Sequence, residues 1–494
     1  MNNIGFDNGK YIELQSKRIL ERIASFGGKL YLEFGGKLFD DYHAARVLPG
    51  FKPDSKIKML LNLKNDAEVI IVVSANSIEQ NKIRGDLGIT YDLDTLRLID
   101  AFNAIDILIG GVVITQYENQ PATDIFIKRL NNLGIKVFKH YSIEGYPTNA
   151  RRIVSDEGFG KNEYVETTKP LVVVTAPGPG SGKMATCLSQ LYHDHKRGIK
   201  AGYAKFETFP IWNLPLRHPV NMAYEAATVD LNDVNMIDPY YLEANGTTAV
   251  NYNRDIEIFP VLRAIFEKIY GECPYKSPTD MGVNMAGFCI TDDDVVCDAA
   301  KMEIVRRYYD TLCRKRNGIA DAEEVYKAEL IMKQVNVDTS FRKVVSPALE
   351  KAERTGAPAV AIELEDGRIV TGKTSSLMGA SAACLLNALK CLGDIDDDYP
   401  LLPVEVIEPI QHLKIDNLGN HNPRLHADEI LIALAISANT CELSKKAMEQ
   451  LPKLKGCQAH LSVMGATIDV GVYKKLGMNV TTEPVYATKK LYHK

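Results

Sequence analysis

The amino-acid sequence predicts a multidomain α/β protein built on a parallel sheet with helices on both faces. Two patterns carry this prediction. Residues 10–160 alternate helical and strand-like apolar periodicity with a repeat of roughly 30 residues, which is typical of the βαβ units of a Rossmann-like sheet. A strand expected at 171–175 then runs through a glycine-rich loop into a helix and a second strand at 200–206, which indicates a P-loop-like β-α-β unit.

These patterns divide the chain into three predicted domains. Residues 1–165 form the Rossmann-like domain, residues 166–335 the P-loop-like unit with a helical insertion, and residues 336–494 a smaller C-terminal α+β domain. In the first domain the expected strands are 29–34, 67–74, 105–115 and 136–140, and the expected helices are 11–26, 56–65, 92–104 and 123–133. The helices expected in the insertion are 256–270, 298–316 and 320–334.

The C-terminal domain combines a hairpin with several helices. The strands expected there are 357–364, 369–372, 458–463 and 479–482, and the helices are 344–355, 382–392, 427–438, 442–451 and 470–476. We expect residues 404–413 to be extended.

Composition excludes several classes of partner. Lys and Arg total 58 and Asp and Glu total 63, so the net charge of −5 offers no basic surplus for nucleic acid or an anionic membrane.

No apolar run reaches the roughly 18 residues of a transmembrane helix, and the N-terminus lacks the apolar core of a signal peptide. Nine cysteines without a CxxC pair favour reduced thiols over disulfides or a zinc site. We therefore expect a cytoplasmic protein.

The segment APGPGSGK at 176–183 is the strongest functional signal in the chain. Glycines let backbone N–H groups turn towards an anion, the following helix adds partial positive charge, and Lys183 adds a full charge. The expected phosphate-binding residues are Gly178, Gly180, Ser181, Gly182, Lys183 and Thr186. The match to G-x-x-x-x-G-K-[ST] is imperfect, because Pro177 replaces the first glycine and Met184 replaces the Mg²⁺-binding hydroxyl. The alternative is a tight turn that needs glycine only for its shape.

Other polar residues follow predicted strands, where ligands of parallel sheets bind. Lys37 and Arg84 are candidates for contact with a phosphorylated ligand, and the alternative is that both lie in solvated loops. Lys205 ends the second strand of the β-α-β unit, and Glu207 and Asp230 are candidate Mg²⁺ ligands from their residue type and position.

Two further clusters of polar residues each allow a functional and a structural interpretation. The triplet Asp292-Asp293-Asp294 precedes a predicted helix, and helix capping is favoured over metal binding there. His421 lies in an Asn- and Gly-rich loop at 417–426 and is a candidate for acid–base or phosphate roles. The alternative is an ordinary surface histidine.

Two resemblances add to this interpretation. Residues 172–209 resemble the first β-α-β unit of the dethiobiotin synthetase and CTP synthase class of P-loop enzymes, and this resemblance implies that Lys205, in Gly202-Tyr203-Ala204-Lys205, lies near an active site. Over its whole length the chain resembles the uncharacterised bacterial protein family 0371, on LEFGGKLFDDYHAARVLPGF (32–51), NKIRGDLGITYD (81–92) and TAPGPGSGKMATCLSQLYHDH (175–195). That resemblance implies a multidomain α/β fold and a cytosolic bacterial protein, but no activity.

The function that the sequence favours is a nucleotide-dependent enzyme, a kinase or an ATP-dependent ligase acting on a small polar substrate. ATP and Mg²⁺ are the expected cofactors, and Lys183, Lys205 and His421 are the expected catalytic residues. One alternative is an enzyme that binds a phosphorylated metabolite in the same loop without nucleotide hydrolysis. Another is a non-enzymatic protein that binds a nucleotide or sugar phosphate. The size of the chain also favours self-association into a homo-oligomer.

Overall fold

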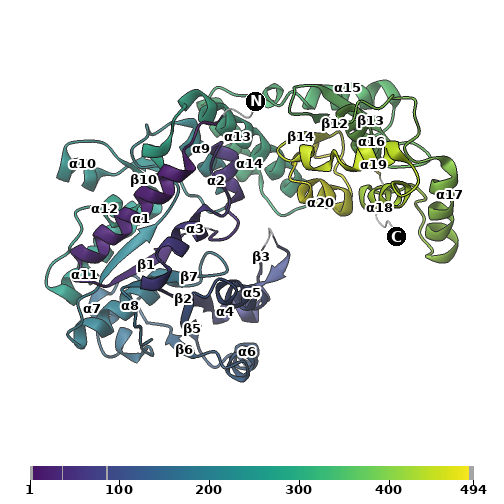
Figure 1. Ribbon diagram of the computed structural model, residues 1–494. Coiled ribbons are helices and arrows are strands. Elements are labelled where there is room, and N and C mark those ends of the chain that lie inside the picture. Colours follow the sequence, from purple (N-terminus) through teal and green to yellow (C-terminus); the bar gives the residue numbers. More distant parts are fainter. Residues whose placement is uncertain (1–3, 36, 85–86, 489–494) are drawn as a thin grey trace. The chain divides into compact units, whose positions relative to one another are not determined.

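A computed structural model describes residues 4–35, 37–84 and 87–488, which form two compact units (Figure 1). The larger unit contains Ile4–Tyr224 and Asp233–Cys297. The smaller unit contains Glu225–Asn232 and the chain from Asp298 onward. Each unit has a sheet covered by helices, so the predicted multidomain α/β class with a smaller C-terminal α+β part is confirmed.

The larger unit is built on a parallel sheet. Within the described residues this sheet has seven strands in the order β11-β8-β1-β7-β2-β5-β6, and all neighbouring strands are parallel. The strands are β1 (Leu30–Phe34), β2 (Ala67–Ser74), β5 (Leu108–Tyr117), β6 (Val137–Tyr141), β7 (Leu171–Thr175), β8 (Gly202–Phe206) and β11 (Gly282–Val283). Strands β1, β2 and β7 are buried along their whole length, which explains their nearly continuous apolar sequences.

The order of these strands does not follow the chain. β7 and β8, which flank the glycine loop and its helix, pair with β1 on its two sides, and β7 also pairs with β2. The division expected after residue 165 therefore runs through a single sheet. Local periodicity identifies each strand, but the neighbours of a strand depend on pairing between distant segments.

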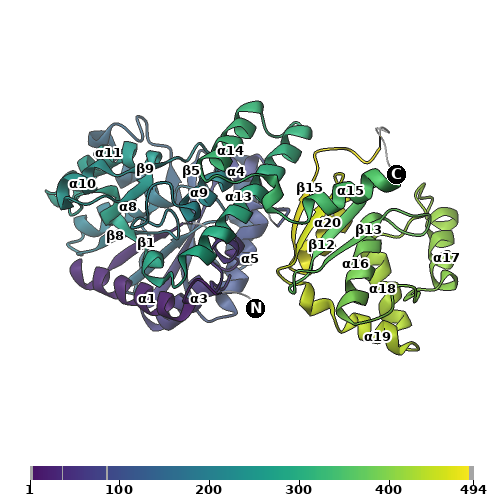
Figure 2. The ribbon, with the colours of Figure 1, turned by 90° about the horizontal axis from the view of Figure 1, so that it is seen from above.

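Helices cover both faces of this sheet. In Figure 2, β1 and β8 run between α8 and α11 on one side and α1 and α3 on the other. On the α8 and α11 side, Tyr31 and Val172 pack in one core with Leu188 and Phe259. The helices of this unit are α1 (Asn8–Ser25), α2 (Tyr42–Val47), α3 (Ser55–Asn62), α4 (Ala75–Glu79), α5 (Tyr91–Asn103), α6 (Pro121–Asn132), α7 (Ala150–Ile153), α8 (Lys183–Lys196), α10 (Pro239–Asn245), α11 (Asn253–Tyr270) and α12 (Pro278–Met281).

The remaining strands of the larger unit form two short antiparallel pairs. These are β3 (Ile83–Arg84) with β4 (Ile89–Thr90), and β9 (Asn235–Ile237) with β10 (Val250–Tyr252). Helices α9 (Pro219–Ala227) and α13 (Asp293–Arg316) each begin in the larger unit and end in the smaller one. None of the helices in the described part of the chain has the length and apolarity needed to cross a membrane.

The smaller unit holds a four-stranded sheet in the order β13-β12-β14-β15. Alternate residues of β12 face opposite sides: Val360 and Ile362 join the core formed with α16 and α18, whereas Ala361 packs with Ala348 of α15. The elements of this unit are β12 (Ala359–Glu363), β13 (Ile369–Lys373), β14 (Gln458–Leu461), β15 (Asn479–Thr482), α14 (Ala322–Gln334), α15 (Val345–Thr355), α16 (Ala380–Leu392), α17 (Val404–His412), α18 (Ala427–Ser437), α19 (Glu442–Met448) and α20 (Thr467–Lys475).

The prediction that residues 404–413 are extended is wrong, because Val404–His412 forms helix α17. Its Val and Ile residues and the internal Pro409 disfavour a helix locally. Ile407 is nevertheless fully buried, and Val406 and Ile410 pack against the same core. Tertiary packing of one helical face therefore outweighs the local preference.

Helix α8, which follows the glycine loop, is fixed to the sheet at its far end by the buried Asp194. This carboxylate accepts hydrogen bonds from Tyr31 (2.8 Å) and Tyr164 (2.5 Å) and pairs with the Lys29 ammonium (2.8 Å). Three groups, from β1 and the segments flanking the sheet, therefore meet at one carboxylate. This network sets the position of α8 and with it the position of the loop at its N-terminus.

We predict that Asp194→Ala lowers the free energy of unfolding by about 3 kcal/mol or more, because it leaves a buried ammonium and two hydroxyls without their partner. The urea midpoint, followed by circular dichroism, measures the change. Asp156→Ala is the matched control, because Asp156 also pairs with a lysine, Lys196 of α8, but its side chain is 81% exposed. Its midpoint should stay close to that of the wild type. Equal losses in both variants would contradict a special role for Asp194.

Candidate functional site

The glycine loop lies beyond the carboxyl end of β7, where parallel sheets bind ligands. Gly180 and Gly182 have positive φ angles of 79° and 89°, a backbone conformation that favours glycine. A Cβ atom on Gly178 would overlap the hydroxyl oxygen of Tyr91. The loop therefore needs glycine at all three positions for its shape.

Side-chain hydroxyls hold the loop in this conformation. Thr115 donates to the carbonyl of Ser181 (2.7 Å), and Ser181 donates to the carbonyl of Gly178 (2.9 Å). Thr186 donates to the carbonyl of Gly182 (3.0 Å) and is fully buried. The two hydroxyls expected to meet a ligand therefore bond to the loop itself, and Thr186 is not placed to bind Mg²⁺.

The N-terminus of α8 has donors that the described part of the protein does not use. Gly182 makes no side-chain capping bond, and the N–H groups of Lys183, Met184 and Ala185 have no acceptor among the described residues. Lys183, which is partly exposed, likewise has no ion pair there. A helix N-terminus with unpaired donors and an adjacent lysine attracts an anion.

A cluster of charged side chains lies at the ends of β1 and β8. The Lys205 ammonium is 2.8 Å from Glu207 Oε1 and 2.5 Å from Asp255 Oδ2, and Asp255 belongs to the first turn of α11. Glu33 of β1 pairs in register with Lys205 and accepts a hydrogen bond from Tyr203 (2.6 Å). Three carboxylates therefore surround one lysine in a largely buried place.

Burial shifts the acid–base behaviour of this cluster. Burial raises the pKa of Glu207 to about 7; Lys205 opposes this rise, and Asp255 and Glu33 add to it. Burial disfavours the Lys205 ammonium, yet Asp255, Glu207 and Glu33 together hold its pKa above the ordinary value. At neutral pH Lys205 is thus a permanent cation, and Glu207 can take or release a proton.

The loop and the charged cluster are neighbours along the edge of the sheet. β1 separates β7 from β8, and adjacent strands lie about 4.8 Å apart, so the two ends are about 10 Å apart. A Cβ atom on Gly35, just after β1, would come within 2.9 Å of the Phe206 carbonyl and 3.2 Å of the Glu207 side chain. Burial and Glu33 raise the pKa of Cys187, whereas Lys183 lowers it, so both charges act on the same thiol.

A cavity of about 30 Å³ opens beside Lys205, Glu207 and Asp255 on the side of β11. Its other walls include Asn251, Thr279 and Asn284. This volume holds a water molecule or a small ion rather than a whole metabolite. A larger ligand would therefore place only a reacting group here.

The structure brings together some of the predicted site residues and separates others from them. Lys205, Glu207, Lys183 and the loop share one edge of the sheet. Arg84 instead pairs with the buried Asp94 (2.9 Å), which also holds Arg97. Lys37 is exposed three residues after β1.

Two other predicted residues belong to the smaller unit. Asp230 lies 3.9 Å from Arg314, and His421 is exposed in the loop before α18. The carboxylates that lie with Glu207 are instead Asp255 and Glu33, which sequence reasoning missed. A signal was present for Glu33, since it is the one charged residue in the buried strand Leu30–Phe34.

The raised pKa of Glu207 predicts a specific pH dependence of stability. The folded protein holds the Glu207 proton until about pH 7, whereas an ordinary carboxyl loses it near 4.5. The free energy of unfolding therefore falls as pH rises between these values, by about 1.4 kcal/mol for each pKa unit, and is level above them. Glu207→Gln should flatten this fall in urea unfolding measured from about pH 5 to about pH 8. Glu243→Gln, on the exposed surface of α10, is the control. Parallel profiles for wild type and Glu207→Gln would contradict the raised pKa.

Comparison with known proteins identifies the family of the chain. Residues 4–336 match the family described as "Domain of unknown function DUF1846, N-terminal", and residues 340–492 match "Domain of unknown function DUF1846, C-terminal". The chain is 57% identical over 494 residues, all of both chains, to UPF0371 protein SpyM50764 of Streptococcus pyogenes serotype M5 (strain Manfredo). It is equally similar, at 57% over the full length of both chains, to UPF0371 protein SUB1165 of Streptococcus uberis (strain ATCC BAA-854 / 0140J). The chain therefore belongs to the DUF1846 family, and these streptococcal relatives carry the UPF0371 name.

Proposed function

We propose that the protein is an enzyme acting on a small phosphorylated substrate, with the phosphate bound at the 176–183 loop and a proton taken up by Glu207. The observation that carries this proposal is the pairing of two features on one sheet edge. One is the helix N-terminus with unpaired donors and Lys183, and the other is a carboxyl group with a pKa of about 7.

The loop supplies the binding energy in this proposal. Its glycine conformation and the internal bonds from Thr115 and Ser181 pre-organise the backbone, so little entropy is lost when an anion binds. The N–H groups of residues 183–185 and the Lys183 ammonium then surround the phosphate. The distance of about 10 Å to the end of β8 suits a metabolite of a few carbon atoms.

Glu207 and Lys205 supply the chemistry. The substrate C–H or O–H bond breaks, its proton goes to a Glu207 oxygen, and the electron pair stays on the substrate. Lys205 stabilises the negative charge that develops, and Asp255 keeps its ammonium in place. The raised pKa of Lys205 suits this electrostatic role and disfavours one as a neutral nucleophile.

A nucleotide-dependent kinase or ligase is the second candidate. The order of strand, glycine loop, lysine and helix favours it, and Glu207 and Asp255 are carboxylates suited to Mg²⁺. In that reaction the acceptor oxygen bonds to the γ-phosphorus of ATP, the bond to ADP breaks, and Glu207 takes the acceptor proton. Against it, Met184 has no hydroxyl and that of Thr186 bonds to Gly182.

The test is thermal unfolding with inorganic phosphate, phosphosugars, ATP, CTP and GTP, each with and without Mg²⁺. A ligand at about 100 times its Kd adds about 2.7 kcal/mol to the stability of the folded state, which is easily measured as a rise in Tm. We expect a phosphosugar to stabilise the wild type but not Lys183→Ala. Lys196→Ala, which removes an exposed lysine at the other end of α8, should respond like the wild type.

Each other outcome decides between the candidates. Stabilisation by Mg-ATP that Lys183→Ala abolishes would favour the kinase or ligase over the phosphometabolite enzyme. Stabilisation that persists in Lys183→Ala would remove the loop from the proposal. A Glu207→Gln variant that binds the ligand as the wild type does, but turns it over at the wild-type rate, would remove Glu207 as the base.

A further inference from the structure

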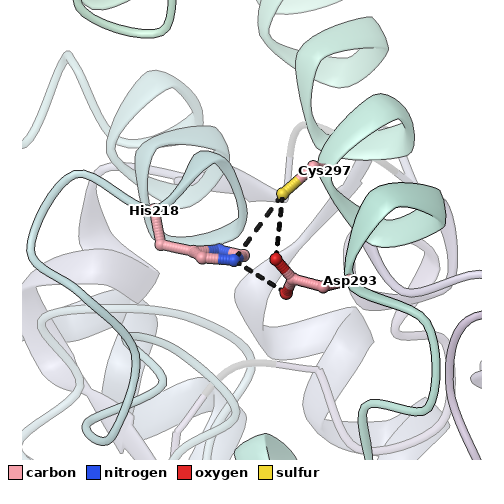
Figure 3. Close-up of side chains that lie close together, drawn as sticks. All are labelled: His218, Asp293 and Cys297. Carbon is pink, nitrogen blue, oxygen red and sulfur yellow. Dashed lines mark hydrogen bonds and ion pairs between the residues drawn. The ribbon is translucent and has the colours of Figure 1, made fainter.

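A second cluster of reactive side chains lies in the larger unit and takes no part in the proposed reaction. His218 precedes α9, and Asp293 and Cys297 lie one turn apart at the start of α13 (Figure 3). His218 Nε2 is 3.0 Å from Asp293 Oδ1 and 3.6 Å from Cys297 Sγ, and that sulfur is 3.8 Å from Asp293 Oδ2. An imidazole, a carboxylate and a thiol thus converge on one point.

Local structure explains how these side chains come together. Asp292 accepts a hydrogen bond from the Val295 N–H (3.2 Å), which confirms the expected capping role for part of the acidic triplet. Asp293 is left to turn towards His218. The His218 ring is held in turn by the Val220 N–H, which donates to Nδ1 (3.2 Å). The ring is buried, whereas the Asp293 side chain is 65% exposed.

The side chains are close enough to share one metal ion, because one ligand atom from each residue can be chosen so that all three lie within 4.8 Å of one another. Zinc binds sulfur, nitrogen and oxygen at about 2.0–2.3 Å, so neighbouring ligand atoms of a tetrahedral site lie about 3.3–3.8 Å apart. The 3.6 Å between His218 Nε2 and Cys297 Sγ falls in that range. The 3.8 Å between Cys297 Sγ and Asp293 Oδ2 lies at its upper end and involves the carboxylate oxygen that is not bonded to His218. The third, 3.0 Å, is a hydrogen bond that would lengthen by a few tenths of an ångström.

We propose that His218, Asp293 and Cys297 bind a transition-metal ion of the zinc class. A thiolate and an imidazole select borderline-soft ions such as Zn²⁺ over Mg²⁺ or Ca²⁺, which prefer oxygen ligands. Three protein ligands leave a fourth position, which can take water because the Asp293 side chain is largely exposed. The proposal does not depend on the phosphate-binding loop.

Binding of the ion exchanges protons for metal bonds. The Cys297 S–H bond breaks, a sulfur–metal bond forms, and the proton goes to solvent. His218 must present the lone pair of Nε2, so its proton leaves that atom and Nδ1 becomes the N–H donor. Nδ1 then no longer accepts from Val220, and α9 loses this capping bond. Because protons are released on binding, the affinity for the metal ion should rise with pH. It should also be weaker than in a site where the histidine already carries its proton on Nδ1.

The sequence carries no zinc motif because the ligands are distant in the chain. His218 lies 75 residues before Asp293 and 79 before Cys297. Only the spacing of Asp293 and Cys297, one turn apart, is local. The expectation that the cysteines hold no zinc rested on the absence of CxxC pairs, and such pairs are one of several ligand arrangements.

The test is titration of the full-length protein, freed of metal by a chelator and kept reduced, with Co²⁺ as the spectroscopic probe. We expect saturation at one equivalent, with a sulfur-to-cobalt charge-transfer band in the near ultraviolet and the intense visible bands of tetrahedral cobalt. Zn²⁺ should displace the cobalt and abolish both. Cys297→Ser should lose the charge-transfer band. Asp293→Asn and His218→Asn, whose asparagine can still cap α9, should bind at least about tenfold more weakly.

Cys441→Ser is the matched control. Hydrogen bonds from Ser444 and Tyr399 lower the pKa of Cys441 to about 7, so this partly exposed thiol can compete for a metal ion. Its removal should leave the cobalt spectrum unchanged. Far-ultraviolet circular dichroism establishes that each variant is folded. A charge-transfer band that survives in folded Cys297→Ser, or a wild type that shows none, would overturn the proposal.

Discussion

The parallel sheet of the larger unit, with β1 between β7 and β8, is the constraint on which the candidate site depends. Parallel strands end at the same edge, so the glycine loop after β7 and Glu207 after β8 are about two strand spacings apart. The register that pairs Glu33 with Lys205 brings a carboxylate and an ammonium together at the ends of two neighbouring strands. Without that strand order, the glycine loop would not lie near Glu207, and Glu33 would not lie beside Lys205.

The charged groups at the two ends of α8 differ in whether they have partners. At the C-terminal end, Asp194 is surrounded by an ammonium and two tyrosine hydroxyls, and its partners satisfy it. At the N-terminal end, backbone donors and Lys183 have no partner in the described chain. The first N–H groups of a helix have no acceptor within it, and an adjacent cation makes such an end favourable for an anion. The contrast along one helix supports assigning anchoring to one end and binding to the other.

Glu207 and Lys205 form a pair whose protonation states are set by burial and by unequal numbers of charges. Three carboxylates face one lysine, so the lysine stays charged, and burial lets Glu207 hold its proton to about pH 7. Burial and neighbouring charges are also what bring the pKa values of functional acids and bases near the working pH. The His218 cluster differs in that its members come from two helix starts and one of them, Asp293, is largely exposed, which suits an exchangeable ion more than a buried reaction.

Local sequence patterns were enough to predict the α/β class, most strands and helices, and the glycine loop between a strand and a helix. Those features depend on residues close together in the chain, such as the apolar run at 171–175 or the glycines after it. Tertiary structure alone decided which strands are neighbours, that Asp255 and Glu33 rather than Asp230 lie with Glu207, and that Val404–His412 is a helix. These depend on contacts between segments many residues apart, whose packing energy outweighs local preference and leaves no period or motif to detect.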